Sequence, residues 1–274
     1  MSTSALEQTA KPREEYSNYL LNMEGVTKTF SNGKVCAVDD VDFYVKHNEV
    51  VGLLGDNGAG KSTLIKLING FHIPDKGKIY FEGERVKFHS PKEARDTGIE
   101  TAYQNLALVN LLNISRNFFM GRELQRKVGP LTFLDKKKMN EISAEFMSEV
   151  GLENIRDMNQ SVNFLSGGER QAISIGRAHY FGARLLILDE PTAALSVMET
   201  EWVLSLVEQA KNRGLSVILI THNAYEAYGV SDRFVVLRHG KNYANINKED
   251  TEAKELVEII AGRSEKYGPQ KQQH

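Results

Sequence analysis

The sequence has almost no cysteine and no long apolar run. Its one cysteine among 274 residues, Cys36, cannot form a disulfide within the chain, and no group of Cys and His residues has the spacing of a zinc site. No stretch approaches the roughly 18 consecutive apolar residues of a membrane span, and residues 1–15 lack the apolar core of a signal peptide. We therefore expect a soluble intracellular protein that would reach a membrane only through a partner.

The sequence also lacks an excess of charge of either sign. There are 34 Lys and Arg residues against 36 Asp and Glu residues, which gives a formal net charge of −2. A broad basic face for nucleic acid is therefore not expected. Hydrophobic residues make up 41% of the chain and charged residues 26%, so the chain can bury a core and stay soluble.

The order of the apolar patterns predicts an α/β fold. The expected strands lie at 20–26, 38–45, 49–54, 78–81, 185–188, 216–220 and 234–238, and the expected helices at 61–69, 135–150, 168–181 and 197–213. Strands and helices alternate in the second half of the chain, which favours a largely parallel sheet. The region 101–165 has a different character, and we interpret it as a mostly helical insertion.

A glycine-rich segment between an expected strand and an expected helix matches a phosphate-binding loop. Residues 55–62 read G-D-N-G-A-G-K-S and fit every fixed position of G-x-x-x-x-G-K-[ST]. In such a loop backbone N–H groups point at phosphate oxygens, the lysine reaches the β- and γ-phosphates, and the serine hydroxyl can ligate Mg²⁺. A glycine-rich turn without a ligand is the alternative, and the full match in its required context favours a nucleotide site. The residues expected to contact the nucleotide here are Gly55, Asp56, Asn57, Gly58, Ala59, Gly60, Lys61, Ser62 and Thr63.

Two carboxylates directly follow the expected strand at 185–188. Asp189 and Glu190 would stand at the carboxyl edge of the sheet, where ligands of parallel sheets collect and where the phosphate loop also lies. We expect Asp189 to hold Mg²⁺ and Glu190 to polarise the attacking water as a general base. An acidic helix cap after a strand is the alternative, and the accompanying phosphate loop favours the catalytic interpretation.

A serine followed by two glycines lies 23 residues before Asp189, in the segment Leu165-Ser166-Gly167-Gly168-Glu169. Taken alone, this segment is typical of a capping box, in which Ser166 caps a helix and Glu169 reaches back to it. The same turn would point a hydroxyl and two N–H groups out of a helix start, which makes a second anion-binding arrangement.

In order and spacing, the phosphate loop, this serine-glycine turn, the acidic strand end and His222 resemble the ATP-binding subunits of ABC transporters, from about residue 20 to 262. The resemblance implies an ATPase with the P-loop NTPase fold. That fold has a RecA-like, mostly parallel sheet core, an N-terminal antiparallel β part and an inserted α-helical subdomain. The implied organisation is a flexible tail at 1–15, the core at 16–100 and 166–262, the helical subdomain at 101–165 and a polar tail at 263–274.

The resemblance also implies roles for individual residues. Gln104 is similar to the glutamine that senses Mg²⁺ and the γ-phosphate, His222 to the switch histidine, and Phe30 to the aromatic residue that stacks on adenine. Each of these residue types, taken alone, is ordinarily structural or simply exposed. The implied catalytic residues are Glu190, His222, Lys61 and Gln104, and the implied Mg²⁺ ligands are Ser62, Gln104 and Asp189.

A head-to-tail dimer follows from the same resemblance. Ser166, Gly167 and Gly168 of one subunit would contact the γ-phosphate held by Lys61 of the other. One segment departs from the family, because residues 193–196 read A-A-L-S where Ser-Ala-Leu-Asp is common, so the loop lacks the Asp of its usual contact across the dimer. A Ser or Thr there is common among the sugar importers of the family.

Further motifs resemble the bacterial monosaccharide importers of the ribose, xylose and fructose type, here in single-cassette form. The similar segments are N-G-A-G at 57–60, F-M-G-R-E at 119–123 and E-P-T-A-A-L at 190–195. The implied function is ATP hydrolysis, with Mg²⁺, that powers import of a monosaccharide. The implied partners are a second copy of the chain, a polytopic membrane permease and, indirectly, a periplasmic sugar-binding protein, with no nucleic acid. The implied location is the cytoplasmic face of the inner membrane.

Other functions remain open at this point. They are a soluble ABC ATPase of DNA repair or translation, an importer ATPase for a solute that is not a sugar, and a regulatory module that binds nucleotide without turnover. Soluble relatives usually carry two cassettes or a long coiled-coil insertion, and this chain has neither. The apolar stretch 106–114 fits equally a contact with the coupling helix of the permease and burial within the helical subdomain.

Overall fold

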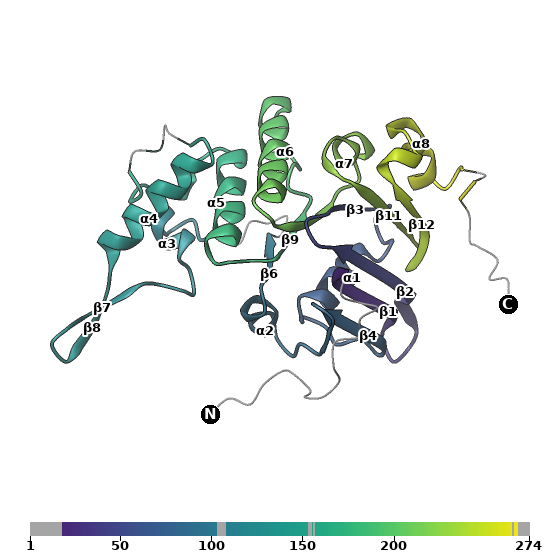
Figure 1. Cartoon of the computed structure of the whole chain (residues 1–274), viewed down its shortest axis with the longest axis horizontal. Helices are drawn as coiled ribbons and strands as arrows, with labels where there is room; N and C mark the ends of the chain where they lie inside the picture. Colours follow the sequence, from purple (N-terminus) through teal and green to yellow (C-terminus); the bar gives the residue numbers. More distant parts are fainter. Residues whose placement is uncertain (1–17, 103–107, 153–154, 156, 265, 268–274) are drawn as a thin grey trace.

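Two sheets and a row of helices form the body of the molecule (Figure 1). The computed structural model describes residues 18–102, 108–152, 155, 157–264 and 266–267. The larger sheet has the strand order β12-β11-β3-β10-β9-β6, and all its neighbouring strands pair in parallel except β11 and β12. Its strands are β12 (Lys241–Asn247), β11 (Arg233–Arg238), β3 (Val50–Leu54), β10 (Ser216–Ile220), β9 (Leu185–Asp189) and β6 (Ile99–Ala102). The expected largely parallel α/β sheet is confirmed.

The smaller sheet is antiparallel and comes mostly from the first part of the chain. Its order is β2-β1-β4-β5, with β2 (Val35–Lys46), β1 (Tyr19–Phe30), β4 (Lys76–Phe81) and β5 (Glu84–Val86). Helix α1 (Lys61–Ile68) packs its apolar side chains into the core that this sheet shares with the larger one. The expected N-terminal antiparallel β part is therefore present.

The central strands are apolar at every position because both faces of the larger sheet are covered. On β10, Ile218 and Ile220 belong to the core shared with the smaller sheet and α1. Val217 and Leu219 point to the opposite face, where they belong to the core formed with α5 (Gly167–Tyr180) and α6 (Val197–Asn212). Helices α1 and α5 thus pack on opposite faces of one sheet.

The chain between β6 and α5 contains more than helices. Its described elements are α3 (Ile114–Phe118), β7 (Gln125–Val128), β8 (Leu131–Leu134), α4 (Lys136–Glu149) and the short 3-10 helix η2 (Val162–Phe164). The β7–β8 hairpin projects beyond the helices at one end of the molecule (Figure 1). The sequence did not predict it, because each strand has only four residues, and β7 reads Q-R-K-V.

The remaining described elements are three helices that contact the larger sheet and one 3-10 helix. They are α2 (Pro91–Asp96), α7 (Ala224–Val230), α8 (Ala253–Ile260) and the 3-10 helix η3 (Lys248–Asp250). The apolar stripe of α6 lies in the core, with Val203, Leu206, Val207 and Ala210 buried and Trp202 packed against them. None of the helices in the described ranges is long and apolar enough to cross a membrane.

Candidate functional site: a nucleotide-binding edge of the sheet

The loop between β3 and α1 has a backbone that only glycine accommodates at two positions. Gly55 has a φ of 144°, and a Cβ there would stand 2.3 Å from the Leu237 carbonyl oxygen. Gly60 has a φ of 105°, and a Cβ there would stand 2.5 Å from the Ala37 carbonyl oxygen. The loop is therefore pressed against β11 and β2, while the N–H groups at the start of α1 remain directed at the space in front of it.

Lys61 is the buried cation of this loop. Its side chain is 7% exposed, and its Nζ donates hydrogen bonds to the carbonyl oxygens of Gly55 at 2.6 Å and Asp56 at 3.1 Å. Burial lowers the pKa of the Lys61 ammonium, whereas the nearby carboxylates of Glu190 and Asp189 act in the opposite direction. An ammonium held this way fits a phosphate ligand, because phosphate oxygens would supply the negative charge that a buried cation needs.

The acidic strand end lies two strands away from the loop. Asp189 ends β9 opposite Ile220 of β10, and β10 pairs in parallel with β3. The carboxyl ends of all three strands meet at one edge, as in other parallel sheets that bind ligands. Glu190 adopts a φ of 48°, and its amide donates to the Ile220 carbonyl oxygen at 2.9 Å. This turn fixes Glu190 at the edge rather than inside the following loop.

His222 comes from the end of the neighbouring strand and meets Glu190. Its Nδ1 lies 3.2 Å from Glu190 Oε1, and the two side chains are 67% and 18% exposed. The structure thus brings together two of the predicted catalytic residues from segments 32 positions apart. A histidine in hydrogen-bond reach of a carboxylate can hold it in one orientation or exchange a proton with it.

Asp189 and Ser62 are the two described residues predicted to bind Mg²⁺. Burial raises the pKa of the Asp189 carboxyl, and the adjacent Glu190 carboxylate raises it further. A cation at this point would relieve both effects. Within the described ranges, no group of three or more His, Cys, Asp and Glu residues could hold a metal. Mg²⁺ usually takes one or two protein ligands and completes its shell with phosphates and water, and the Ser62 hydroxyl and Asp189 carboxylate are of the oxygen type that it prefers.

The serine-glycine turn starts α5 with the predicted capping box. Ser166 Oγ accepts from the Glu169 amide at 3.3 Å, and the Ser166 amide donates to Glu169 Oε2 at 2.7 Å. Gly167 lies against Leu195, where a Cβ would stand 2.4 Å from Leu195 Cδ2. The turn and the loop at 193–196 therefore form one contiguous surface, on the helices that pack against the face of the sheet opposite α1.

Ser196 has a clear role in this structure. It caps α6 in a second capping box, with its Oγ accepting from the Glu199 amide at 3.3 Å and its own amide donating to Glu199 Oε2 at 3.0 Å. Ser and Asp are about equally good at this position of a helix. The departure from the usual Asp therefore leaves the start of α6 intact.

Of the two remaining predicted site residues, Phe30 and Gln104, the structure describes only Phe30. Phe30 ends β1, is partly buried, and makes an edge contact with His72, with ring centroids 5.2 Å apart. The adenine contact of Phe30 stays a prediction. Gln104 lies outside the described residues.

Sequence reasoning missed Glu226, which connects the segments after β9 and β10. Its carboxylate accepts hydrogen bonds from Thr192 Oγ1 at 2.5 Å and Asn223 Nδ2 at 2.8 Å. Asn223 in turn caps α7 and directly follows His222. Glu226 therefore holds the segment after Glu190 to the segment that carries His222. An acidic residue in a first helical turn is so common that the sequence offers no signal for this role.

We expect Glu226→Gln to lower ATP turnover about 10- to 100-fold while ATP affinity stays the same, because the variant misplaces Glu190 and His222 without touching the phosphate loop. Phosphate release and equilibrium nucleotide binding measure the two effects separately. Glu201→Gln, on the exposed side of α6, is the matched control and should leave both unchanged. Wild-type turnover in Glu226→Gln would exclude this positioning role.

Asp75 clamps the end of β1 that carries Phe30. It accepts from Lys28 Nζ at 2.8 Å, the Thr29 amide at 2.7 Å and the Thr29 hydroxyl at 2.8 Å. The hydrogen bond from Lys28, followed by those from Thr29, lowers the pKa of Asp75 to about 2. A carboxylate with a lowered pKa stabilises the fold above its ordinary pKa, and that stabilisation is lost as the pH falls toward 2.

Asp75→Asn is therefore expected to reduce the free energy of unfolding by about 1 kcal/mol near neutral pH, a modest value because the side chain is 39% exposed. The difference from the wild type should shrink as the pH falls below about 4. Urea unfolding followed across this pH range tests it. A difference that stays constant down to the lowest pH would contradict the clamp.

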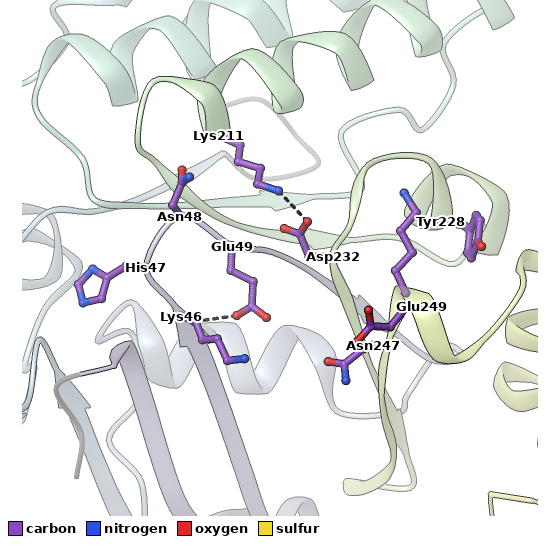
Figure 2. A pocket seen from close by; sticks show the side chains of 10 residues that line it. Lys46, His47, Asn48, Glu49, Lys211, Tyr228, Asp232, Asn247 and Glu249 are labelled. Carbon is purple, nitrogen blue, oxygen red and sulfur yellow. Dashed lines mark hydrogen bonds and ion pairs between the residues drawn. The ribbon is translucent and has the colours of Figure 1, made fainter.

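A polar cleft lies at the other, amino edge of the sheet, among Lys46, His47, Lys211, Asp232 and Lys248 (Figure 2). Lys211 Nζ lies 2.6 Å from Asp232 Oδ1, and the Lys46 amide donates to Glu49 Oε2 at 2.7 Å. Glu49 also pairs at 2.8 Å with Arg233, which is 2% exposed. The carboxylates of Asp232 and Glu49 therefore already have partners. Their ion pairs and hydrogen bonds stabilise the edge of the sheet opposite the nucleotide loop.

Comparisons with known proteins agree with this geometry. The ABC transporter family model matches residues 38–193. The chain is 48% identical to the xylose/arabinose import ATP-binding protein of Sulfolobus acidocaldarius, over 88% of this chain and 93% of that protein. It is 42% identical to the fructose import ATP-binding protein of Rhizobium meliloti, over 90% and 95%. It is 39% identical to a ribose import ATP-binding protein of Streptomyces avermitilis, over 89% of this chain and only 45% of that longer protein.

Solved structures share the fold. An ATP-binding cassette of an ABC transporter in its ADP conformation superposes with a TM-score of 0.75 at 25% identity, covering 89% of this chain and 99% of the other. A dimeric cassette in a post-hydrolysis state, bound to ADP and phosphate, superposes with a TM-score of 0.70 at 24% identity, covering 83% and 98%. The family model spans more than half of the chain, and two relatives above 40% identity match nearly from end to end. The chain therefore belongs to the ABC transporter family, as an ATP-binding subunit.

Proposed function

We propose that the chain is the ATP-hydrolysing subunit that powers import of a monosaccharide. The observation that carries this proposal is the match over nearly the full length of two sugar-import ATP-binding proteins, one for xylose and arabinose and one for fructose. Both relatives are single cassettes of about this length, whereas the ribose-import relative is about twice as long. A single cassette in turn needs a second copy to form a pair.

The residues at the carboxyl edge of the sheet divide the work on ATP. Lys61 and the loop N–H groups hold the β- and γ-phosphates, and Phe30 stacks on the adenine. Ser62 and Asp189 hold Mg²⁺, which neutralises phosphate charge when bound. Glu190 accepts the proton of the attacking water, and His222 keeps the Glu190 carboxylate oriented through the 3.2 Å contact. Gln104, which lies outside the described residues, is proposed as the glutamine that senses Mg²⁺ and the γ-phosphate.

The serine-glycine turn serves the ATP of a second copy. The phosphate loop starts α1 on one face of the larger sheet, and the turn starts α5 on the other face. A helix start with an exposed hydroxyl is an anion-binding element, and a head-to-tail pair would bring it to the γ-phosphate on the facing subunit. In this pair Ser166, Gly167 and Gly168 complete the site whose Lys61 belongs to the other chain.

The remaining partners follow from the transport function. A polytopic permease would carry the sugar and respond to closing and opening of the ATPase pair, and a periplasmic sugar-binding protein would deliver the sugar to it. The subunit would then lie on the cytoplasmic face of the membrane. The division into a core at 16–100 and 166–262 and a subdomain at 101–165 is part of the same proposal, with the subdomain including the β7–β8 hairpin.

Affinity purification of the tagged chain from its own cells in mild detergent tests the proposal. We expect a stoichiometric partner with several apolar spans of about 20 residues, and ATPase activity of the purified complex that rises with a monosaccharide and its binding protein. Soluble repair or ribosomal partners without a membrane protein would contradict it. Activation by a solute that is not a sugar would support the assignment as an importer subunit and would contradict the assignment of a monosaccharide as its substrate.

A further inference from the structure

The β7–β8 hairpin carries an apolar face that nothing in the described structure covers. Val128 pairs with Leu131, and Arg126 pairs with Phe133, so these four side chains share one face of the two-stranded ribbon. Val128 is 53% exposed, Leu131 60% and Phe133 48%. The other face carries Lys127 and Thr132. The hairpin is therefore amphipathic, with three large apolar side chains on one face.

The position of the hairpin calls for a partner. It projects away from α3 and α4 at the end of the molecule (Figure 1), anchored at its base by the Asp135 amide, which donates to the Leu124 carbonyl oxygen at 2.8 Å. A two-stranded hairpin is marginally stable in water unless its apolar face packs on something. Exposed apolar side chains gathered on one projecting element mark an interaction surface.

The charge around this face is strongly positive although the whole chain is close to neutral. Residues 125–138 contain Arg126, Lys127 and the three lysines 136–138 against a single acid, Asp135. The lysines occupy the first turn of α4, which has no acidic residue, and cations there oppose the helix dipole. All three are exposed, and Lys137 Nζ lies 3.8 Å from the exposed Glu141 Oε1, one turn along the same helix. These lysines therefore do not stabilise α4, and we look for their role in an interaction with a ligand or partner.

We propose that residues 125–138, named here the lipid-contact hairpin, bind the surface of an anionic phospholipid membrane. Clustered Lys and Arg are attracted to acidic headgroups, and neighbouring Phe, Leu and Val side chains insert at the boundary between headgroups and acyl chains. The hairpin supplies both, with the apolar residues on its projecting strands and the lysines at its base. The inference rests on the proposed function in one respect, because an importer subunit lies within reach of the cytoplasmic leaflet.

Vesicle flotation of the purified full-length chain tests the proposal. Wild type is expected to float with vesicles that contain phosphatidylglycerol, to stay unbound with phosphatidylcholine alone, and to lose binding as salt is raised. Lys137→Gln should weaken vesicle binding about fivefold, and replacing all three lysines by Gln should weaken it about 100-fold. Phe133→Ser should also weaken it, at unchanged charge. Lys254→Gln, an exposed lysine on α8, is the matched control and should bind like wild type.

The outcomes separate this proposal from the importer proposal. ATPase activity of each variant, measured without vesicles, reports whether the variant is folded. Equal binding to neutral and anionic vesicles, or equal binding by the triple lysine variant and wild type, would overturn the lipid contact. Absence of wild-type binding to anionic vesicles would also overturn it, and loss of the co-purifying permease in Phe133→Ser would then show that the hairpin docks on protein.

Discussion

Glutamine in place of Glu190 is expected to lower ATP turnover roughly 100- to 10,000-fold and to leave ATP bound as tightly as before. The Glu190 amide is fixed on Ile220, and its carboxylate lies beside His222. Glutamine has nearly the same shape and can keep these contacts, but it cannot take a proton from water. Phosphate release under saturating ATP measures the loss, and equilibrium binding of ATP measures what is retained.

The control for this variant is Glu208→Gln, which removes one carboxylate from the exposed side of α6. It should keep both turnover and affinity. If Glu190→Gln hydrolysed ATP at the wild-type rate, another group would have to act as the base. If it lost ATP affinity instead, the role of Glu190 would be in binding.

Methionine in place of Lys61 is expected to weaken ATP binding about 10- to 100-fold, because each charge-assisted hydrogen bond to phosphate contributes about 1.5–3 kcal/mol. Stability should stay the same or rise. Burial lowers the pKa of the Lys61 ammonium, so its removal relieves a desolvation cost that offsets the loss of its hydrogen bonds to the Gly55 and Asp56 carbonyl oxygens. Titration calorimetry with ATP and thermal unfolding of the free protein test the two statements together.

Lys66→Met is the matched control for Lys61→Met, because Lys66 lies in the last turn of the same helix and carries the same charge. It should bind ATP like wild type. A large loss of melting temperature in Lys61→Met would contradict the account, since the lost affinity would then reflect a damaged fold. Unchanged affinity with unchanged stability would remove Lys61 from the phosphate site.

Contiguous motifs made much of this site predictable from sequence. The phosphate loop, Asp189–Glu190 and the turn at Ser166 each depend on neighbours within a few residues. Their strand and helix contexts follow from local periodicity, and the structure has those elements within a few residues of the predicted ends. The parallel order of β3, β10 and β9 then places the phosphate loop and the acidic strand end at one edge.

Features that depend on distant contacts were not predictable in the same way. Glu226 acts through Thr192, which lies 34 positions earlier, and only the side-by-side packing of the two segments reveals the pair. The hairpin strands are short and polar on one face, so their alternation is too brief to recognise. Helix α8 differs, because Leu256 and Ile259 of its apolar face are spaced as a helix requires, and the sequence could have predicted it.

In the proposed pair, the serine-glycine turn of one subunit completes the ATP site of the other. Ser166→Asp tests this contact without disrupting the helix, because Asp caps a helix as well as Ser and preserves the start of α5. Its added negative charge would face the γ-phosphate of the second subunit, while the phosphate loop of its own chain stays unchanged. The variant should therefore prevent two subunits from pairing while each chain still binds ATP.

The most direct measurement is the molar mass of Glu190→Gln in solution by light scattering, with and without ATP and Mg²⁺. We expect 30.8 kDa without nucleotide and about twice that mass with ATP, since the uncleaved nucleotide holds the pair together. Adding Ser166→Asp should keep the mass at 30.8 kDa while ATP still binds. Doubling of the Ser166→Asp chain, or a Glu190→Gln chain that binds ATP and stays at 30.8 kDa, would contradict the composite site.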